Sequence, residues 1–535
     1  MASWSLLLTT RAAADTLHGA TNDGVFNKAC LRRLLGNRRI TSSTCFSGIG
    51  APETGSGIFT AAVTAALGED LGFEIQPKWA VELKQQAQQV LMSMPHPPEH
   101  VHQDVLDFLP KRLRRQVDKA MTTPPLSNEL KHQISSCALQ RSQWCVRSGT
   151  YVDVPRTEQH IAGSPCTEHS HLGKQVGLGG GTAALLYTWI AIVRNFRFPI
   201  FVHENVAAFP DTVFNGALGD LYFIVRLRID SYTNGWPDKR DRVWDIGVLK
   251  AVLDLELRSM ARPPRMMQML EQTYKNLFNR TCEFGWTLFL FAGDAAGPDG
   301  ECDGDDWPQE KKWAASRALV LERHASAGTP FDPETSEGFE LLTDGELVRW
   351  HGYQACRDKV LAGPGQTYFA CDVGQNPTQR RMFTDAAGVL PTLTCGMGLY
   401  FFDDLPPGVP TAYGPQELGV RSRFITQHEL LEIMGFPIRK STVKSLHGVA
   451  HAFSASNQSD PFGKTHSSMS RQCGNSQHVG VVGPLVMLLS LTIIPEAKKE
   501  ESDSSVPKAV ANRKPSASAF HSAFNKRRCI RSQTI

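Results

Sequence analysis

Three short runs of the sequence carry reactive side chains, and each lies beside an apolar stretch typical of a buried strand. They are Gly-Ser-Pro-Cys at residues 163–166, His-Glu-Asn-Val at 203–206 and Lys-Arg-Asp-Arg at 239–242. A thiolate can add to C6 of a cytosine ring, and this addition makes C5 nucleophilic enough to attack a methyl donor. A carboxyl group can protonate N3, and a guanidinium group can hold O2, as charge develops on the ring. The candidates for these three roles are Cys166, Glu204 and Arg242.

Each run has a plainer interpretation when it is taken alone. A cysteine is usually an inert buried side chain, a glutamate after a strand is often a solvated strand end or an N-cap, and residues 239–242 read as an exposed charged turn. A turn after a strand, close to cationic side chains, instead predicts an exposed Cys166 with a lowered thiol pKa. The order of the three runs, downstream of a ligand-binding signature, favours the chemical interpretation.

That signature is Thr-Cys-Phe-Ser-Gly-Ile-Gly at residues 44–50. Alternate glycines between a strand-like stretch from Ile40 and a helix-like stretch at 58–67 allow a tight turn against a ligand, with a simple turn as the alternative. Glu82 and Asp104 end two further strand-like stretches, and doubly wound folds bind a ribose with an acid at such a place. The three strand ends predict a single ligand pocket.

In this order the runs resemble DNA (cytosine-5)-methyltransferases, over about residues 41–489. The resemblance implies S-adenosylmethionine as the cofactor and double-stranded DNA with a flipped cytosine as the substrate. It also implies a mobile catalytic loop at 170–181. The implied catalytic residues are Cys166, Glu204, Arg240 and Arg242. The implied cofactor-binding residues are Phe46, Gly48, Ile49, Gly50, Glu82, Leu83, Asp104, Val105, Pro165, Asn475 and Ser476.

Three positions depart from the family's pattern. Thr167 follows the nucleophile where the family usually has Gln, and Thr44 replaces an acid at the start of the cofactor motif. Asp238 stands where a Gln precedes the arginine pair, and its carboxylate is expected to hold one arginine away from the substrate. These departures bear on the rate of the reaction rather than on its class.

The fold implied is α/β, a doubly wound Rossmann-like methyltransferase domain with a smaller target-recognition domain. We expect an N-terminal extension at 1–40 and a catalytic, cofactor-binding part at 41–252 that contains an insertion at about 106–155. A target-recognition domain is expected at 253–387 and a return to the catalytic domain at 388–495. Within the recognition region, the polar run 375–381 carries side chains that can pair with base edges, with a polar surface turn as the alternative.

Composition agrees with an intracellular enzyme. The chain has 535 residues and 41% hydrophobic content, which suffices for a large domain and a smaller one. None of its 12 cysteines forms a Cys-x-x-Cys pair, so we expect no zinc module and no bound metal. An acidic stretch at 299–310 approximates a calcium loop, but Pro308 within it favours a surface loop. The apolar run 479–494 is too short to span a bilayer and is predicted to be a buried helix.

The net charge of +3 is mild, so DNA binding must depend on local basic clusters. Such clusters occur at 28–39 and 111–115, and another lies in the tail 496–535, which its composition predicts to be disordered. The terminal basic run predicts nuclear import. The acid-free segment 1–14 leaves a plastid or mitochondrial location as the alternative.

Two other functions remain open at this stage. One branch of the family methylates cytosine in tRNA, but it usually carries a Cys-Phe-Thr motif that residues 253–387 lack. The other function is that of a catalytically inactive DNA-binding relative. Thr167 and Asp238 favour it, whereas the intact Cys166 and Glu204 argue against it. We expect a monomeric catalytic unit without a membrane partner.

Overall fold

The computed structural model describes most of the chain up to residue 252 and shorter segments beyond it. The longer described ranges are 35–123, 125–170, 175–252, 263–282, 342–360, 368–378, 383–385, 389–393, 399–403, 423–436 and 476–492, and isolated positions are described at 32, 286, 320, 321, 323–325, 327 and 328. The segments 1–31, 299–310 and 496–535 lie outside the described residues. The predictions made for these segments therefore stay predictions.

A seven-stranded sheet forms the centre of the fold, in the order β3-β2-β1-β6-β7-β9-β8. Its strands are β1 (Arg39–Cys45), β2 (Glu74–Val81), β3 (His100–His102), β6 (Gln159–Gly163), β7 (Ile200–Val206), β8 (Tyr222–Asp230) and β9 (Asp241–Leu249). Neighbouring strands from β3 to β7 pair in parallel, whereas β9 is antiparallel to both β7 and β8. The predicted doubly wound α/β sheet is thus confirmed, with one reversed strand near its edge.

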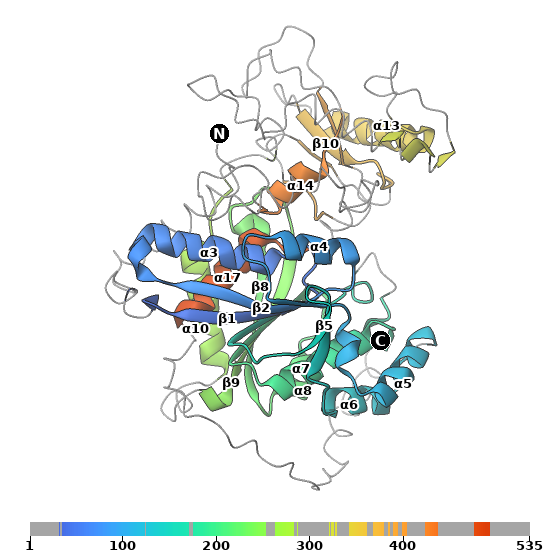
Figure 1. Ribbon diagram of the computed structural model, residues 1–535. Coiled ribbons are helices and arrows are strands. Elements are labelled where there is room, and N and C mark those ends of the chain that lie inside the picture. Colours follow the sequence, from blue (N-terminus) through green and yellow to red (C-terminus); the bar gives the residue numbers. More distant parts are fainter. Residues whose placement is uncertain are drawn as a thin grey trace, which may run out of the picture. The chain divides into compact units, whose positions relative to one another are not determined.

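Helices cover both faces of this sheet (Figure 1). One face carries α3 (Ala51–Leu67), α4 (Gln85–Ser93), α10 (Pro263–Phe278) and α17 (Val479–Thr492), and the other carries α5 (Lys111–Thr122), α6 (Asn128–Ser136), α7 (Ala183–Phe196) and α8 (Thr212–Leu218). Each set closes its own hydrophobic core, and the strands contribute alternate residues to the two cores. In β2, for example, Ala80 belongs to the first core, while Trp79 and Val81 belong to the second.

Short 3-10 turns connect several of these elements. They are η1 (Glu69–Leu71), η2 (Val105–Phe108), η3 (Gly177–Gly179), η4 (Ser231–Thr233) and η5 (Lys250–Val252). The insertion predicted at 106–155 contains α5, α6 and a two-stranded hairpin of β4 (Ser142–Cys145) and β5 (Thr150–Asp153). Its apolar side chains, among them Leu113, Val117 and Ile134, are buried in the second core. The insertion is therefore part of the packed fold.

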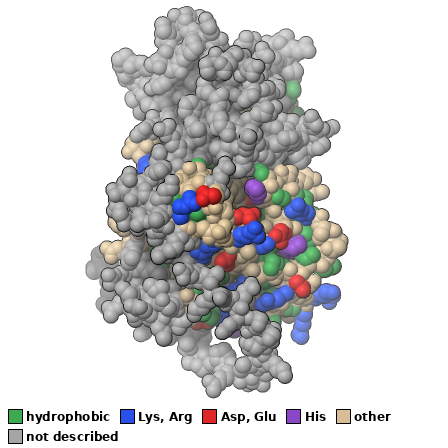
Figure 2. Space-filling model, turned by 60° about the vertical axis from the view of Figure 1, so that its left-hand side comes forward, with side chains coloured by type: hydrophobic (Ala, Val, Ile, Leu, Met, Phe, Trp, Pro, Cys, Tyr) green, Lys and Arg blue, Asp and Glu red, His purple; other side chains and the backbone are tan. Residues whose placement is uncertain are grey.

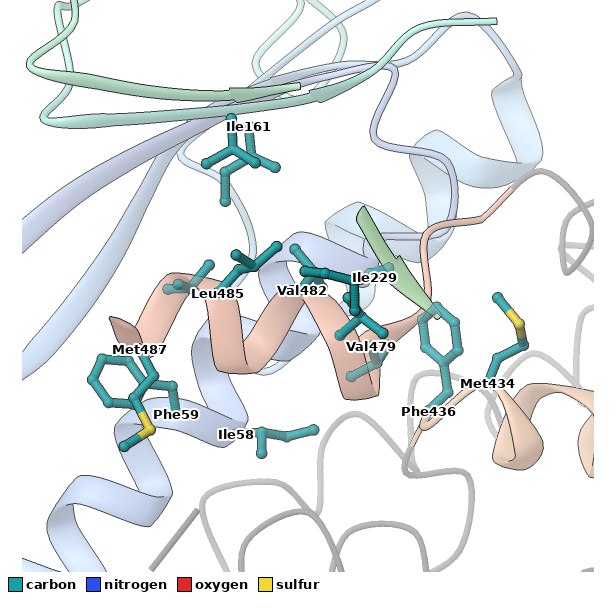
Figure 3. Close-up of a cluster of buried hydrophobic side chains, with 14 of the residues drawn as sticks. Ile58, Phe59, Ile161, Ile229, Met434, Phe436, Val479, Val482, Leu485 and Met487 are labelled. Atoms are coloured by element: carbon teal, nitrogen blue, oxygen red, sulfur yellow. The ribbon is translucent and has the colours of Figure 1, made fainter. Parts of the chain in front are cut away.

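The last described helix, α17, lies against α3 although more than four hundred residues separate them (Figure 3). Its side chains Val479, Val482 and Leu485 are buried in the first core together with Ile58 of α3 and Ile161 of β6. The prediction of a buried helix at this position is confirmed. Among the described residues, no helix is long and apolar enough to cross a membrane.

Beyond residue 252 the described elements include helix α10 and a second, smaller sheet. Helix α10 contacts β8, and its side chains Leu270, Tyr274 and Phe278 join the first core. A second sheet, in the order β11-β10-β12-β13, contains strands from both sides of residue 387. Its strands are β10 (Tyr368–Asp372), β11 (Phe383–Asp385), β12 (Leu399–Asp403) and β13 (Arg423–Phe424), and the helices nearest in sequence are α13 (Asp344–Val360) and α14 (Gln427–Ile433).

Candidate active site

The predicted catalytic side chains lie at the ends of three adjacent strands. Cys166 follows the end of β6, Glu204 lies in β7, and Arg242 is near the start of β9. The register pairs Gly163 of β6 with Glu204, and Val206 of β7 with Arg242. Because β9 runs antiparallel to β7, its first residues lie at the same edge of the sheet as the last residues of β6 and β7. Sheet topology therefore brings the three runs together.

Glu204 and Arg242 form an ion pair in which Arg242 Nε lies 3.0 Å from Glu204 Oε1. Both side chains are largely shielded from solvent, at 11% exposure for Glu204 and 14% for Arg242. Arg240 is more deeply buried and donates hydrogen bonds to the carbonyl oxygens of Ser476, at 2.5 Å, and Leu393, at 3.4 Å. Burial, together with the neighbouring Arg242 charge, lowers the pKa of Arg240 to about 10. Arg240 thus joins the β9 edge to the segment before α17.

The Cys166 thiol is half-buried, and its pKa is raised rather than lowered. Burial is the main cause, and the Glu204 carboxylate adds to it, whereas Arg242 and Arg240 act in the opposite direction. The sequence-based prediction of a lowered thiol pKa is wrong for the chain without a ligand. It counted the cationic neighbours but not the loss of solvent or the adjacent carboxylate.

Hydrogen bonds from β7 hold the loop that carries Cys166. Asn205 Nδ2 donates to the carbonyl oxygen and the hydroxyl of Ser164, at 3.2 and 3.1 Å. The Ser164 hydroxyl also lies 2.8 Å from His203 Nε2. After the nucleophile the backbone turns at once, because the carbonyl oxygen of Cys166 accepts from the amides of His169 and Ser170. Ser164 is thereby anchored two residues before the thiol.

The glycine-rich loop joins β1 to α3 through left-handed backbone conformations. The angle φ is +58° at Phe46, +55° at Gly48 and +81° at Gly50. A Cβ atom at Gly48 would meet nothing within 4 Å, so the backbone there borders open space. At Gly50 the left-handed φ of +81° favours glycine, and an added Cβ atom would also displace the end of the Met94 side chain. The loop therefore offers an accessible backbone to a ligand.

The acids of the predicted cofactor site lie beside this loop. Glu82 accepts hydrogen bonds from the amides of Gly48, at 2.8 Å, and Lys84, at 2.9 Å. Asp104 caps η2 by accepting from the amide of Leu106 and forms an ion pair of 2.9 Å with Arg114. Leu83 is 63% exposed, an unusual state for leucine that provides an apolar surface beside Glu82. Acids, an open backbone and an apolar surface together fit a nucleoside such as that of S-adenosylmethionine.

The remaining predicted cofactor residues differ in their surroundings. Ile49 and Val105 are buried in the two cores, and Pro165 is half-buried next to the nucleophile. Ser476 is buried, and its hydroxyl donates to the carbonyl oxygen of Gln477 at 3.1 Å. Asn475 lies outside the described residues, as do residues 171–174 of the predicted catalytic loop.

A family model for the C-5 cytosine-specific DNA methylases matches residues 146–486, which is more than half of the chain. The chain belongs to the C-5 cytosine-specific DNA methylase family. The matched range includes the Cys166 loop, β7, β9 and most of α17. Membership in this family supports a methyltransferase that acts on cytosine. Members of the family depend in general on S-adenosylmethionine.

Solved structures similar to this methylase are also methyltransferases. A prophage-encoded E. coli protein described as a DNA modification methyltransferase has 15% identity and a TM-score of 0.38, covering 84% of this chain and 98% of its own. The S. pombe Dnmt2 methyltransferase has 13% identity and a TM-score of 0.38 with the same coverage. The Entamoeba histolytica methyltransferase EhMeth has 11% identity and a TM-score of 0.35, again with 84% and 98% coverage. A comparison with curated proteins found no match.

Asp238 of this methylase is bound by a residue that sequence reasoning missed. Its Oδ1 lies 3.1 Å from His478 Nε2, and both side chains are buried. Since the amide of Gly480 donates to His478 Nδ1, the other ring nitrogen carries the proton and donates to Asp238. Arg242, meanwhile, pairs with Glu204. The expectation that Asp238 would compete for an arginine is therefore not met for Arg242.

A second residue was also missed beside the cofactor loop. Thr44 stands where the family has an acid, and its hydroxyl donates to Glu53 Oε1 at 2.5 Å. Glu53 lies in the first turn of α3 and is buried, and burial raises its pKa to about 7. Its Oε2 has no hydrogen-bond partner in the described structure. A carboxyl group thus lies behind the loop despite the substitution at Thr44, and an acid three residues after Gly50 was the available signal.

Charged side chains of both signs are distributed over the face of the methylase shown in Figure 2. In the basic cluster predicted at 111–115, Lys111, Arg112 and Arg115 of α5 are exposed. Arg114 is instead held by Asp104, Asp107 and Asp118, at 2.8–3.0 Å. Three of the four basic side chains of this cluster are therefore accessible to a phosphate backbone.

Proposed function

We propose that this protein transfers a methyl group from S-adenosylmethionine to C5 of cytosine in double-stranded DNA, through a covalent bond between Cys166 Sγ and C6. The main support for this proposal is the Glu204–Arg242 ion pair. Both of its charges shift the pKa of the half-buried Cys166 thiol, in opposite directions. A nucleophile, a carboxyl group and a guanidinium group at adjacent strand ends are what addition to C6 requires. Membership in a family of DNA methylases favours DNA as the substrate.

Arg242, Glu204 and Cys166 each have a separate role in the reaction. Arg242 holds O2 of a cytosine flipped out of the duplex, and Glu204 gives a proton to N3. Cys166 gives its thiol proton to water and forms the bond from sulfur to C6. The C5–C6 π pair moves into the C4–C5 bond and the C4–N3 π pair takes the proton at N3, which leaves C5 nucleophilic. After C5 has taken the methyl group and given its proton to water, the bond from sulfur to C6 breaks and its electron pair leaves with the thiolate. Glu204 then recovers the N3 proton.

The residues present fit the methyl donor. Bound S-adenosylmethionine supplies an electrophilic methyl group. We assign its binding to the open backbone at Gly48, the acids Glu82 and Asp104, and the apolar surface of Leu83. The raised pKa of Cys166 keeps the thiol protonated in the free protein, which limits reaction of the nucleophile before DNA and donor have entered.

The test measures tritium transfer from labelled S-adenosylmethionine to duplex DNA and, in parallel, to tRNA. Transfer to the duplex with a covalent adduct on 5-fluorocytosine DNA, mapped to Cys166 by peptide mass, is the expected result. Cys166→Ser should abolish turnover, and Glu204→Gln should lower it about a hundredfold or more. Cys137→Ser, which alters another half-buried cysteine, is the matched control and should retain full activity. Transfer to tRNA alone, or full activity of Cys166→Ser, would contradict the proposal.

A further inference from the structure

Gln477 has a buried amide group that nothing in the described structure satisfies. The residue is 7% exposed, and neither its Oε1 nor its Nε2 has a hydrogen-bond partner. Buried amide groups in folded proteins almost always have partners, because removing them from water without compensation is unfavourable. An unpaired amide beside a proposed active site therefore suggests that a ligand supplies the partner.

Contacts made by the residues before and after Gln477 hold its backbone in position. The carbonyl oxygen of Ser476 accepts from Arg240, and His478 is bound to Asp238 and to the amide of Gly480. The residues on both sides of Gln477 are thus anchored to the β9 edge and to α17. This anchoring fixes the position of the Gln477 backbone next to the site.

The amide lies beside the catalytic carboxylate. A Cβ atom at Gly163 would lie 2.9 Å from Gln477 Nε2 and 3.1 Å from Glu204 Oε2, so the two groups flank the same point. The other carboxylate oxygen, Glu204 Oε1, is the one paired with Arg242. Arg242 therefore pairs with one oxygen of Glu204, while the other oxygen and the Gln477 amide nitrogen both lie near Gly163.

This arrangement matches the edge of a cytosine ring. O2, N3 and the 4-amino group stand in a row along that edge, and the proposed function assigns O2 to Arg242 and N3 to Glu204. The 4-amino group then falls next to Gln477. The amide nitrogen of Gln477 lies on the side of Gly163. Its Oε1 is an acceptor without a partner in the described structure and can bind a donor.

We propose that Gln477 Oε1 accepts a hydrogen bond from the 4-amino group of the target cytosine and makes the enzyme selective for a pyrimidine that carries this group. The inference rests on the proposed function, because it takes the orientation of the base from Arg242 and Glu204. A site built to bind a polar substrate group discriminates strongly against an analogue that lacks it.

The experiment pairs one substitution with one change in the base. Two duplexes carry either 5-fluorocytosine or 5-fluoro-2-pyrimidinone, which lacks the 4-amino group, at every cytosine position of one strand. The rate of covalent adduct formation is measured with each duplex, for the wild type and for Gln477→Met. Because the missing amino group also alters the reactivity of the ring, the informative quantity is the ratio of the two rates, compared between the proteins.

We expect the preference for the base with the amino group to fall about tenfold in Gln477→Met. Gln477→Asn, which keeps an amide but withdraws its oxygen, should lose the preference similarly and serves if the Met variant fails to fold. Gln159→Met is the matched control. The buried Gln159 amide lies away from the site and donates to the Ser490 hydroxyl at 2.9 Å. An unchanged ratio in both Gln477 variants, with the wild type forming adducts, would overturn the role of Gln477 alone. Absence of any wild-type adduct would overturn the proposed function and this inference with it.

Discussion

Glu53 shows how burial changes a single carboxyl group next to the cofactor loop. Its pKa is raised from 4.5 to about 7, mainly by loss of solvent, although the Thr44 hydroxyl donates to it. Between these two pH values, the folded chain keeps the Glu53 proton while the unfolded chain releases it. Raising the pH through this window therefore destabilises the folded state.

We predict that Glu53→Gln removes this pH dependence. From pH 4.5 to 7, the wild type should lose about 3 kcal/mol of unfolding free energy relative to the variant, since each unit of pKa shift is worth about 1.4 kcal/mol. Urea denaturation of both proteins at several pH values measures this loss of unfolding free energy. Glu129→Gln, at an exposed first-turn position of α6, is the control. Parallel pH profiles for the wild type and Glu53→Gln would contradict the argument.

At the scale of elements, α3 and α17 approach each other closely through glycines. A Cβ atom at Gly55 of α3 would lie 2.9 Å from the backbone nitrogen of Gly483 and 3.0 Å from Val482 Cγ1. Backbone cannot move aside as a flexible side chain can. Gly55→Ala should therefore lower the unfolding free energy by about 1–3 kcal/mol.

The matched control is Gly216→Ala in α8, where an added Cβ atom would meet nothing within 4 Å. Alanine has the higher helix propensity, so this change should be neutral or stabilise by up to about 1 kcal/mol. Thermal unfolding of both variants makes the comparison. Equal effects of the two substitutions would show that the α3–α17 contact is looser than its geometry implies.

At the scale of the whole molecule, the end of the family match is needed for both the core and the site. Helix α17 contributes Val479, Val482 and Leu485 to the first core, and Ser476 just before it accepts from Arg240. A chain ending at residue 475 should therefore lack cooperative unfolding, as judged by circular dichroism during heating. A chain ending at 494, which removes only residues 495–535, should unfold like the full protein. Cooperative unfolding of the shorter chain would refute this role of α17.

The sequence by itself determined the family and the type of fold. The runs at 163–166, 203–206 and 239–242 need particular side chains at particular strand ends, and such local requirements are visible in residue order. Only the tertiary structure decided the state of those side chains. The raised pKa of Cys166, the His478 partner of Asp238 and the unpaired amide of Gln477 depend on burial and on contacts between distant segments. Desolvation and pairing arise from the packed surroundings of a group, and the chain sets those surroundings only once it has folded.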